Sequence, residues 1–260
     1  MKSDPSVLLS FDVEEFDLPL EYNQHISVER QLSVGLEGLS NIMPLLQQRE
    51  ISTTLFTTAF FAEHFPVVLQ KLSAKHEIAS HTYYHTHFKE EDLEASLKKL
   101  EEITNKKVYG LRMPRMKPVP GNIVAVAGYK YNSSINPCWI PGRYNNRHIS
   151  RTIFNDNGII QVPVSVTPNL RIPLFWLAFK NMSYSMYLRL ALQTLKKDGY
   201  LCLYFHPWEF AGIDTYDIPS YIKRADPAKL FSKLTRLVND LSNEAKFITM
   251  QEFVSASSNA

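Results

Sequence analysis

The segment HEIASHTYYH, residues 76–85, carries the strongest pattern in the 260-residue chain. A short strand pattern ends at His81, and a second histidine, His85, follows four residues later. Two imidazoles at this spacing can meet one cation if the chain turns helically after the strand. The alternative for such a pair is a helix start with ordinary hydrogen bonds, so the rest of the sequence has to decide between the two.

Two histidines do not complete a metal site, because a catalytic zinc normally takes three protein ligands and leaves one position for water. The first apolar strand pattern ends in FDVEEFD, residues 11–17, which makes Asp12, Glu14 and Glu15 the candidates for a third ligand. Carboxylates at i and i+2 point to the same side of a strand, so one could ligate a metal while the other accepts a proton. The alternative is that residues 11–17 form an acidic loop that is exposed to solvent and has no catalytic role.

Around these segments, short β-branched or aromatic runs alternate with longer amphipathic ones, which is the pattern of a parallel sheet covered by helices. We expect about eight strands, near residues 6–12, 51–57, 76–81, 107–112, 129–135, 159–166, 200–206 and 246–250. Helical patterns are clearest at 28–49, 89–105, 183–197 and 227–243, the last with Asp226 as a candidate N-cap before Pro227. The pattern predicts an α/β fold, a complete or distorted (β/α) barrel, in a single domain over residues 1–260 with a frayed tail at 255–260.

In such barrels the chemistry lies at the carboxyl ends of the strands. The unusual polar residues fall there: the acidic cluster after the first strand, the two histidines after the third, Arg112 and Arg115 after the fourth, and His206 after the seventh. An arginine fork can fix a carboxylate and keep its pKa low. His206 has an ordinary pKa near neutrality, which suits a general acid for a leaving amine. Taken singly, these residues also have ordinary structural explanations: the two arginines beside a proline could form a surface turn, and His206 could be a capped histidine at the edge of the core.

Composition excludes several classes of protein. The 28 basic and 26 acidic residues leave a formal charge of +2, which gives no sign of a nucleic-acid or anionic-membrane partner. The longest apolar stretch, residues 172–179, is too short for a membrane span of about 20 residues. The N-terminal segment lacks the pattern of a secretory signal, so we expect a cytoplasmic protein. Cys138 and Cys202 form no Cys-x-x-Cys pair and are expected to be buried thiols.

Together, these segments resemble the polysaccharide deacetylases of the NodB-homology group, carbohydrate esterase family four, from Leu8 to Glu209. The most specific match is HEIASHTYYH, which is very close to the family's His-Glu-Ile-Gly-Asn-His-Thr-x-x-His. The order of the other matching segments agrees with the family: SFDVE at 10–14, TLF at 54–56, RMP at 112–114, a weakened motif at 133–139 and LYFH at 203–206.

The resemblance implies a distorted (β/α) barrel of seven to eight strands that binds one divalent metal, usually zinc, and hydrolyses an N-acetyl or O-acetyl group on a glycan. It implies that Asp12 takes a proton from a metal-activated water, that Arg112 keeps Asp12 ionised, and that His206 protonates the departing amine. The developing oxyanion would be met by the metal and by a backbone N–H near Met116.

The sequence departs from the family pattern at two places. Val13 stands where the family has its second aspartate, so we expect Glu14 to join His81 and His85 as the third metal ligand, with Glu15 in reserve. The aspartate that orients the general-acid histidine in the family has no counterpart between Tyr129 and Gly142, and Glu209 is the candidate substitute.

Candidate substrate-binding residues are Tyr84, Trp139 and Trp208, as platforms for a sugar ring, and Arg143, from the basic loop 141–151. The expected partner is an acetylated glycan or a cytoplasmic glycan precursor. Two alternatives stay open, because relatives of the same fold open cyclic amides such as ureides, and because the two departures also suit a non-catalytic carbohydrate-binding protein.

Overall fold

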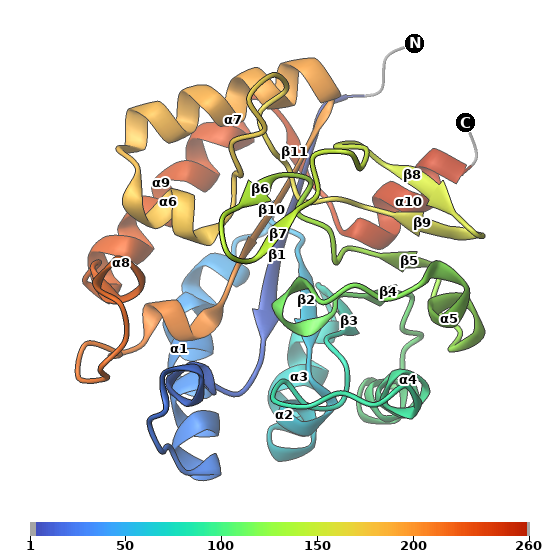
Figure 1. Ribbon diagram of the computed structural model, residues 1–260, viewed down its shortest axis with the longest axis vertical. Helices are drawn as coiled ribbons and strands as arrows, with labels where there is room; N and C mark the ends of the chain where they lie inside the picture. The colour runs from blue at the N-terminus through green and yellow to red at the C-terminus, as the bar shows by residue number, and fades with distance from the viewer. Residues whose placement is uncertain (1–3, 259–260) are drawn as a thin grey trace.

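The central strand of the fold is β1 (Ser6–Val13), in a computed structural model that describes residues 4–258. From Val7 to Val13 every residue of β1 is buried, as expected for a parallel strand that is covered on both faces. The strand pairs in parallel with β10 on one side and with β2 and β11 on the other. Figure 1 shows β1 passing through the middle of the molecule.

Over residues 4–258, nine strands form one curled sheet in the order β10-β1-β2-β3-β4-β5-β9-β8, with β11 beside β1. All pairs are parallel except β8 with β9. The other strands of this sheet are β2 (Thr54–Thr57), β3 (Glu77–Ser80), β4 (Gly110–Leu111), β5 (Tyr131–Asn132), β8 (Phe154–Asp156), β9 (Ile159–Gln161), β10 (Tyr200–Phe205) and β11 (Lys246–Phe247). A separate antiparallel hairpin consists of β6 (Trp139–Ile140) and β7 (Tyr144–Asn145).

The barrel is distorted because its ladder does not close between β9 and β10. The segment after β9 spans the gap with single hydrogen bonds, in which Val162 N donates to Asn132 O and Ser165 N donates to Cys202 O, at 2.8 and 2.9 Å. The predicted fold, a distorted barrel in one domain, is therefore confirmed as a curled half-barrel.

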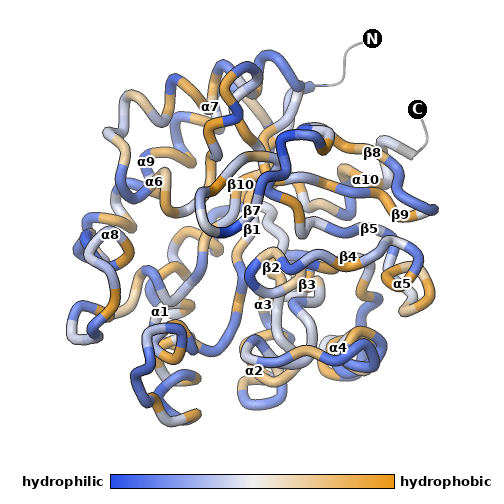
Figure 2. The backbone as a smooth tube through the Cα atoms, viewed as in Figure 1, coloured by the Kyte–Doolittle hydropathy of each residue, from blue (hydrophilic) through white to orange (hydrophobic). Residues whose placement is uncertain are grey.

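The helices lie around the outside of the sheet (Figure 1). In α9, the Asp226 side chain accepts a hydrogen bond from Lys229 N, and five apolar side chains from Leu230 to Leu241 are buried. Figure 2 shows that polar and apolar positions alternate along the turns of the helices. The helices are α1 (Val28–Leu46), α2 (Ala59–His64), α3 (Pro66–Ser73), α4 (Glu91–Thr104), α5 (Gly121–Val126), α6 (Trp176–Asn181), α7 (Tyr184–Asp198), α8 (Ser220–Lys223), α9 (Pro227–Ser242) and α10 (Met250–Ser258), and the 3₁₀ turns are η1 (Leu18–Tyr22), η2 (Pro114–Met116) and η3 (Pro207–Phe210).

Each of the predicted strands and helices has a counterpart, but several strands are shorter than expected. The predicted strand 159–166 keeps ladder pairing only through Gln161, because its second half bridges the open side of the barrel. The predicted frayed tail differs as well, since residues 255–258 continue α10; residues 259–260 lie outside the described part of the chain.

Both cysteines are buried, as expected. Within residues 4–258 no helix is long and apolar enough to cross a membrane.

Candidate active site

The predicted site residues meet at the carboxyl ends of the parallel strands. Asp12 lies in β1, Glu14 directly follows it, and His81 follows β3. Parallel strands place these ends at one edge of the sheet, and the register aligns Phe11 with Phe205, one residue before His206. A cavity with an empty volume of about 720 Å³ opens there, and its lining includes Asp12, Glu14, His81, His85 and His206.

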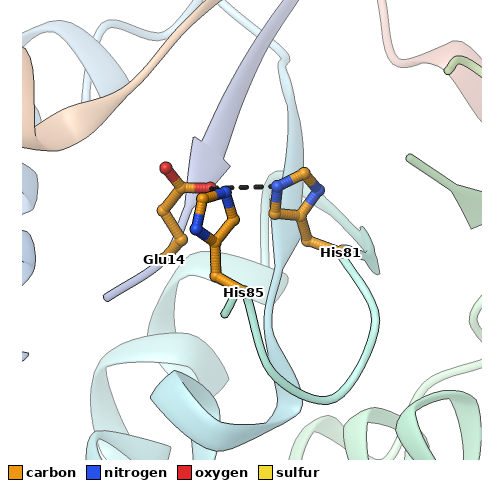
Figure 3. A group of neighbouring side chains, drawn as sticks. All are labelled: Glu14, His81 and His85. Atoms are coloured by element: carbon orange, nitrogen blue, oxygen red, sulfur yellow. Dashed lines mark ion pairs between the residues drawn. The ribbon is translucent and has the colours of Figure 1, made fainter. Parts of the chain in front are cut away.

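Glu14, His81 and His85, which all line this cavity, form a buried three-residue cluster (Figure 3). Glu14 Oε2 lies 2.9 Å from His81 Nε2 and 3.2 Å from His85 Nε2. The ligand atoms all lie within 4.8 Å of one another. Among the described residues Glu14 Oε2 has no regular hydrogen-bond partner, so it is a buried oxygen left facing two imidazole nitrogens.

The partners of the two rings fix which nitrogen faces Glu14. His81 Nδ1 lies 2.8 Å from Arg112 O, and His85 Nδ1 lies 2.7 Å from Asp17 Oδ1. A carbonyl or carboxylate oxygen only accepts, so each Nδ1 carries the hydrogen and each Nε2 can offer a lone pair to a cation. This donor set, two Nε2 atoms and one carboxylate oxygen, fits a catalytic zinc-type ion.

Electrostatics of the cluster also favour a cation at this position. Burial alone would lower the pKa of His85, but the carboxylates of Glu14 and Asp17 outweigh it and raise the pKa to about 9. Burial would raise the pKa of Glu14, yet the facing histidines hold it far below its ordinary value. The site therefore takes up positive charge.

The chain between the two histidines does not make the helical turn that the spacing suggested. It bends at Thr82, which has a left-handed φ of 63°. The bend is held by Thr82 N donating to Ser80 Oγ at 3.1 Å and by Ala59 N, at the start of α2, donating to Thr82 O at 3.0 Å. A β-branched residue in this conformation is strained, so the surrounding hydrogen bonds enforce the bend that brings His85 back to His81.

Glu15, the reserve ligand, is buried but lies outside the cluster. Its Oε2 accepts from Thr58 Oγ1 at 2.7 Å, and its Oε1 accepts from the backbone N–H of His85 at 2.8 Å. Both oxygens are thus used to join α2 and the histidine loop to the end of β1.

Asp12 lies beside the cluster and pairs with Arg112, whose guanidinium donates to Oδ1 at 2.6 Å. Arg112 is fully buried and also donates to Ser10 Oγ, Ser133 O and Ser133 Oγ. The second oxygen, Asp12 Oδ2, lies 3.8 Å from His206 Nε2. The three expected catalytic side chains are therefore brought together.

His206 has Glu209 as its partner, since Nδ1 lies 3.2 Å from Glu209 Oε1. Burial alone would lower the pKa of His206, but its hydrogen bond to Glu209 and the charges of Glu14 and Asp12 raise it. The imidazole is thus held in its protonated form to a higher pH than a free histidine, which suits a proton donor.

The expected substrate residues lie in different places. Trp208 lines the cavity but is buried and donates from Nε1 to Glu14 Oε1, so it supports the cluster. Arg143 lines the cavity from the β6–β7 hairpin and faces Glu21 at 3.6 Å. Trp139 is 56% exposed on the same hairpin, outside the cavity lining. Tyr84 is not brought to the cavity and packs on Phe60 and His87.

Sequence reasoning missed a polar wall of the cavity formed by Asn136, Tyr144 and Tyr204. The Asn136 amide donates to the hydroxyls of Tyr144 and Tyr204 at 3.0 and 3.4 Å. Aromatic residues in strand-like runs read as core, and only the partners in space identify this wall. The expected oxyanion donor at Met116 is not free, because its N–H donates to Met113 O at 3.1 Å.

Two histidines and a carboxylate beside an Asp–Arg pair and a further histidine, all at the carboxyl ends of a half-barrel, are the features of a hydrolase active site. Comparison with known sequences indicates the family. The sequence model of the family described as Polysaccharide deacetylase matches residues 2–129, a range that includes Asp12, Glu14, His81, His85 and Arg112. This match, over just under half of the chain, confirms the resemblance that the motifs predicted. No curated protein matches the chain at a significant level.

Solved structures with the same fold have diverse descriptions. A probable polysaccharide deacetylase from Pseudomonas aeruginosa PAO1 aligns with a TM-score of 0.67 and 15% identity over 95% of this chain and 88% of its own. Puue allantoinase aligns with a TM-score of 0.64, 15% identity and the same coverages. A CE4 family pseudoenzyme from Bacillus anthracis aligns with a TM-score of 0.50 and 14% identity over 97% of this chain and 66% of its own. At these identities the likeness concerns the fold.

Proposed function

We propose that this protein is a metal-dependent hydrolase that removes an acetyl group, in the first place an N-acetyl group, from a sugar of a polysaccharide or glycan precursor. The observation that carries the proposal is the meeting of the Glu14–His81–His85 cluster with Asp12 and His206 in one cavity. The match of residues 2–129 to the polysaccharide deacetylase family model supports it.

In this proposal Glu14, His81 and His85 hold one divalent ion, with zinc as the first candidate. Three protein ligands leave a coordination position for water or for a substrate oxygen. The bound ion would supply Lewis acidity toward the acetyl carbonyl and would lower the pKa of water. Glu14 would take the place of the family's second aspartate, which stands where this chain has Val13. Its side chain is longer than that of aspartate and reaches the imidazole rings of both His81 and His85.

Asp12 and His206 move the protons. Asp12 accepts a proton from water as the water oxygen adds to the acetyl carbon. Arg112 occupies Oδ1 of Asp12, which leaves Oδ2 as the oxygen nearer His206 and the proton acceptor. His206 then gives its Nε2 proton to the sugar nitrogen as the carbon–nitrogen bond breaks, so that acetate and a free amine are formed.

A glycan is the substrate class in this proposal. Arg143 at the rim and the exposed Trp139 on the neighbouring hairpin would contact the parts of the sugar chain that lie outside the cavity. The acetyl group itself would lie against the cavity wall that includes Tyr144, Phe175 and Trp176.

The first experiment measures bound metal. The protein is purified without a histidine tag, and zinc, nickel, cobalt and iron are quantified in the wild type and in Glu14→Ala, His81→Ala and Glu15→Gln. We expect about one equivalent in the wild type and in Glu15→Gln, and none in the other two. Glu15→Gln is the matched control because Glu15 is an equally buried neighbour whose oxygens are used elsewhere. A wild type that binds no metal after reconstitution with zinc contradicts the proposal.

The second experiment separates the proposal from its rivals. The metal-loaded protein is assayed for acetate release from N-acetylglucosamine oligomers and O-acetylated xylan, and for ring opening of ureides. Acetate release that is lost in Asp12→Asn and His206→Asn supports the proposal. Ring opening without acetate release favours the cyclic-amide hydrolase. Sugar binding without turnover favours the non-catalytic relative.

A further inference from the structure

A buried lysine lies behind the candidate general acid. Lys180, in α6, places Nζ 3.0 Å from Glu209 Oε2, and both side chains are only 1% exposed. Glu209 Oε1 accepts from the backbone N–H of His206 at 2.8 Å and faces its Nδ1 at 3.2 Å. Lys180, Glu209 and His206 therefore form a continuous chain from α6 to the cavity.

The side chain of Lys180 is almost fully enclosed by its neighbours. Its Nζ lies 5.1 Å from the ring centre of Trp176 and 5.9 Å from that of Trp208, and it donates to Ile222 O at 2.8 Å. Removing two charges from water is costly, and apolar residues of similar volume are often as stable or more stable than a buried ion pair. Stability alone therefore gives a poor account of this pair.

The pair has a direct consequence for the imidazole. The ammonium favours the ionised form of Glu209, and burial, which would raise the pKa of Glu209, is outweighed by Lys180 and His206 so that the pKa is lowered. An ionised carboxylate only accepts hydrogen bonds, so Nδ1 of His206 has to carry the hydrogen. The opposite nitrogen, Nε2, is then the one directed toward Asp12 Oδ2, 3.8 Å away.

We propose that Lys180 is a positioning residue for the reaction: through Glu209 it keeps a hydrogen on Nδ1 of His206, so that Nε2 is the nitrogen that takes up a proton and gives it to the substrate nitrogen. Lys180 in α6 and Glu209 in η3 would thus orient His206 in place of the aspartate that is missing between residues 129 and 142. The inference rests on the proposed function because it assigns His206 the acid role.

The test compares Lys180→Met with Lys180→Arg in the zinc-loaded protein. Side-chain ¹⁵N–¹H spectra of histidine-labelled protein report which nitrogen of neutral His206 carries the hydrogen, and His206→Asn assigns the signals. We expect Nδ1–H in the wild type and in Lys180→Arg, and a shift toward Nε2–H in Lys180→Met. Lys197→Met, at an exposed position of α7, is the control for loss of a lysine.

Kinetics provide the second readout. Lys180→Met should lower kcat about 10- to 100-fold with little change in KM, and Lys180→Arg should recover most of it. A purely structural lysine would change the melting temperature of the protein and leave the tautomer unchanged, and that result overturns the inference. If Lys180→Met does not fold, Glu209→Gln tests the same link, because it removes the charge and keeps the shape.

The spectra also separate two kinds of failure. If the wild type releases no acetate but the His206 tautomer still changes in Lys180→Met, the proposed function is contradicted. The link between Lys180 and His206 is then still supported. An active wild type whose His206 tautomer is the same in Lys180→Met and Glu209→Gln contradicts the inference alone.

Discussion

The indole Nε1 of Trp208 donates a hydrogen bond of 2.9 Å to Oε1 of Glu14. The same indole stacks on His206 with ring centres 4.8 Å apart. One side chain therefore contacts both the metal-ligand candidate and the acid candidate. Because the indole occupies Oε1, the other carboxylate oxygen of Glu14 is directed toward the two histidines.

Trp208→Phe should weaken metal binding about 10- to 100-fold, since outer hydrogen bonds of this kind orient a ligand and tune its affinity. Phenylalanine keeps the stacking surface and removes only the N–H donor. Competition titration with a chromophoric zinc chelator measures the effect. Trp139→Phe, at the exposed tryptophan, should leave the affinity unchanged, and equal affinities in all three proteins would argue against this role for the indole.

Arg112→Met should lower the free energy of unfolding by about 3–5 kcal/mol, because it leaves the buried Asp12 carboxylate without its cation. The pair is fully enclosed, with 0% and 4% side-chain exposure. Urea denaturation at neutral pH measures the loss. Adding Asp12→Asn to Arg112→Met should recover part of the stability, since it removes the unpaired charge; a double variant that is less stable than Arg112→Met would contradict this explanation.

The sequence predicted the fold and the grouping of the site because both depend on local, periodic signals. Strand patterns that end in Asp12, His81 and His206 place these residues at one edge of a parallel sheet whatever the loop conformations are. The spacing of Asp12 and Glu14 predicted two carboxylates on one side of the chain at the end of β1 for the same reason.

The remaining features depend on contacts between distant segments. The bend at Thr82 is set by hydrogen bonds to Ser80 and to the start of α2, and no local pattern marks a threonine for a left-handed conformation. Lys180 lies 29 positions before Glu209 and directly follows the apolar run 172–179, so its pairing was not visible in the sequence. Trp208 read as a sugar platform because the acceptor of its N–H, Glu14, is 194 residues away.

Both cysteines should resist alkylation in the folded protein. Burial raises the pKa of Cys138 and of Cys202 to about 11 each, so little thiolate, the reactive form, is present at pH 8. Mass spectrometry after treatment with iodoacetamide should find neither thiol modified in buffer and both modified in urea. Rapid labelling in buffer would show that one of the two segments opens.

His76 should make the stability of the protein fall as the pH drops from 6.5 toward 4. Its Nε2 lies 3.0 Å from Leu46 O, which only accepts, and its Nδ1 faces the N–H and hydroxyl of Thr53 at 3.3 and 3.0 Å. Nδ1 therefore acts as an acceptor and has no place for a second proton. Burial, helped by the neighbouring charge of Lys75, lowers the pKa of His76 from 6.5 to about 4.

Because the folded pKa lies below the unfolded one, the unfolded chain binds the proton first as the pH falls. The contribution of His76 to stability is complete above pH 6.5 and is lost progressively toward pH 4; by pH 5 it should be reduced by about 2 kcal/mol. Urea denaturation of the wild type and His76→Gln at pH 8, 6.5 and 5 measures this difference, because other titrating groups are common to both proteins. His76→Gln should be the less stable protein at pH 8 and should lose less stability on acidification. Parallel stability curves for the two proteins would show that His76 takes up a proton in the folded state as readily as in the unfolded chain.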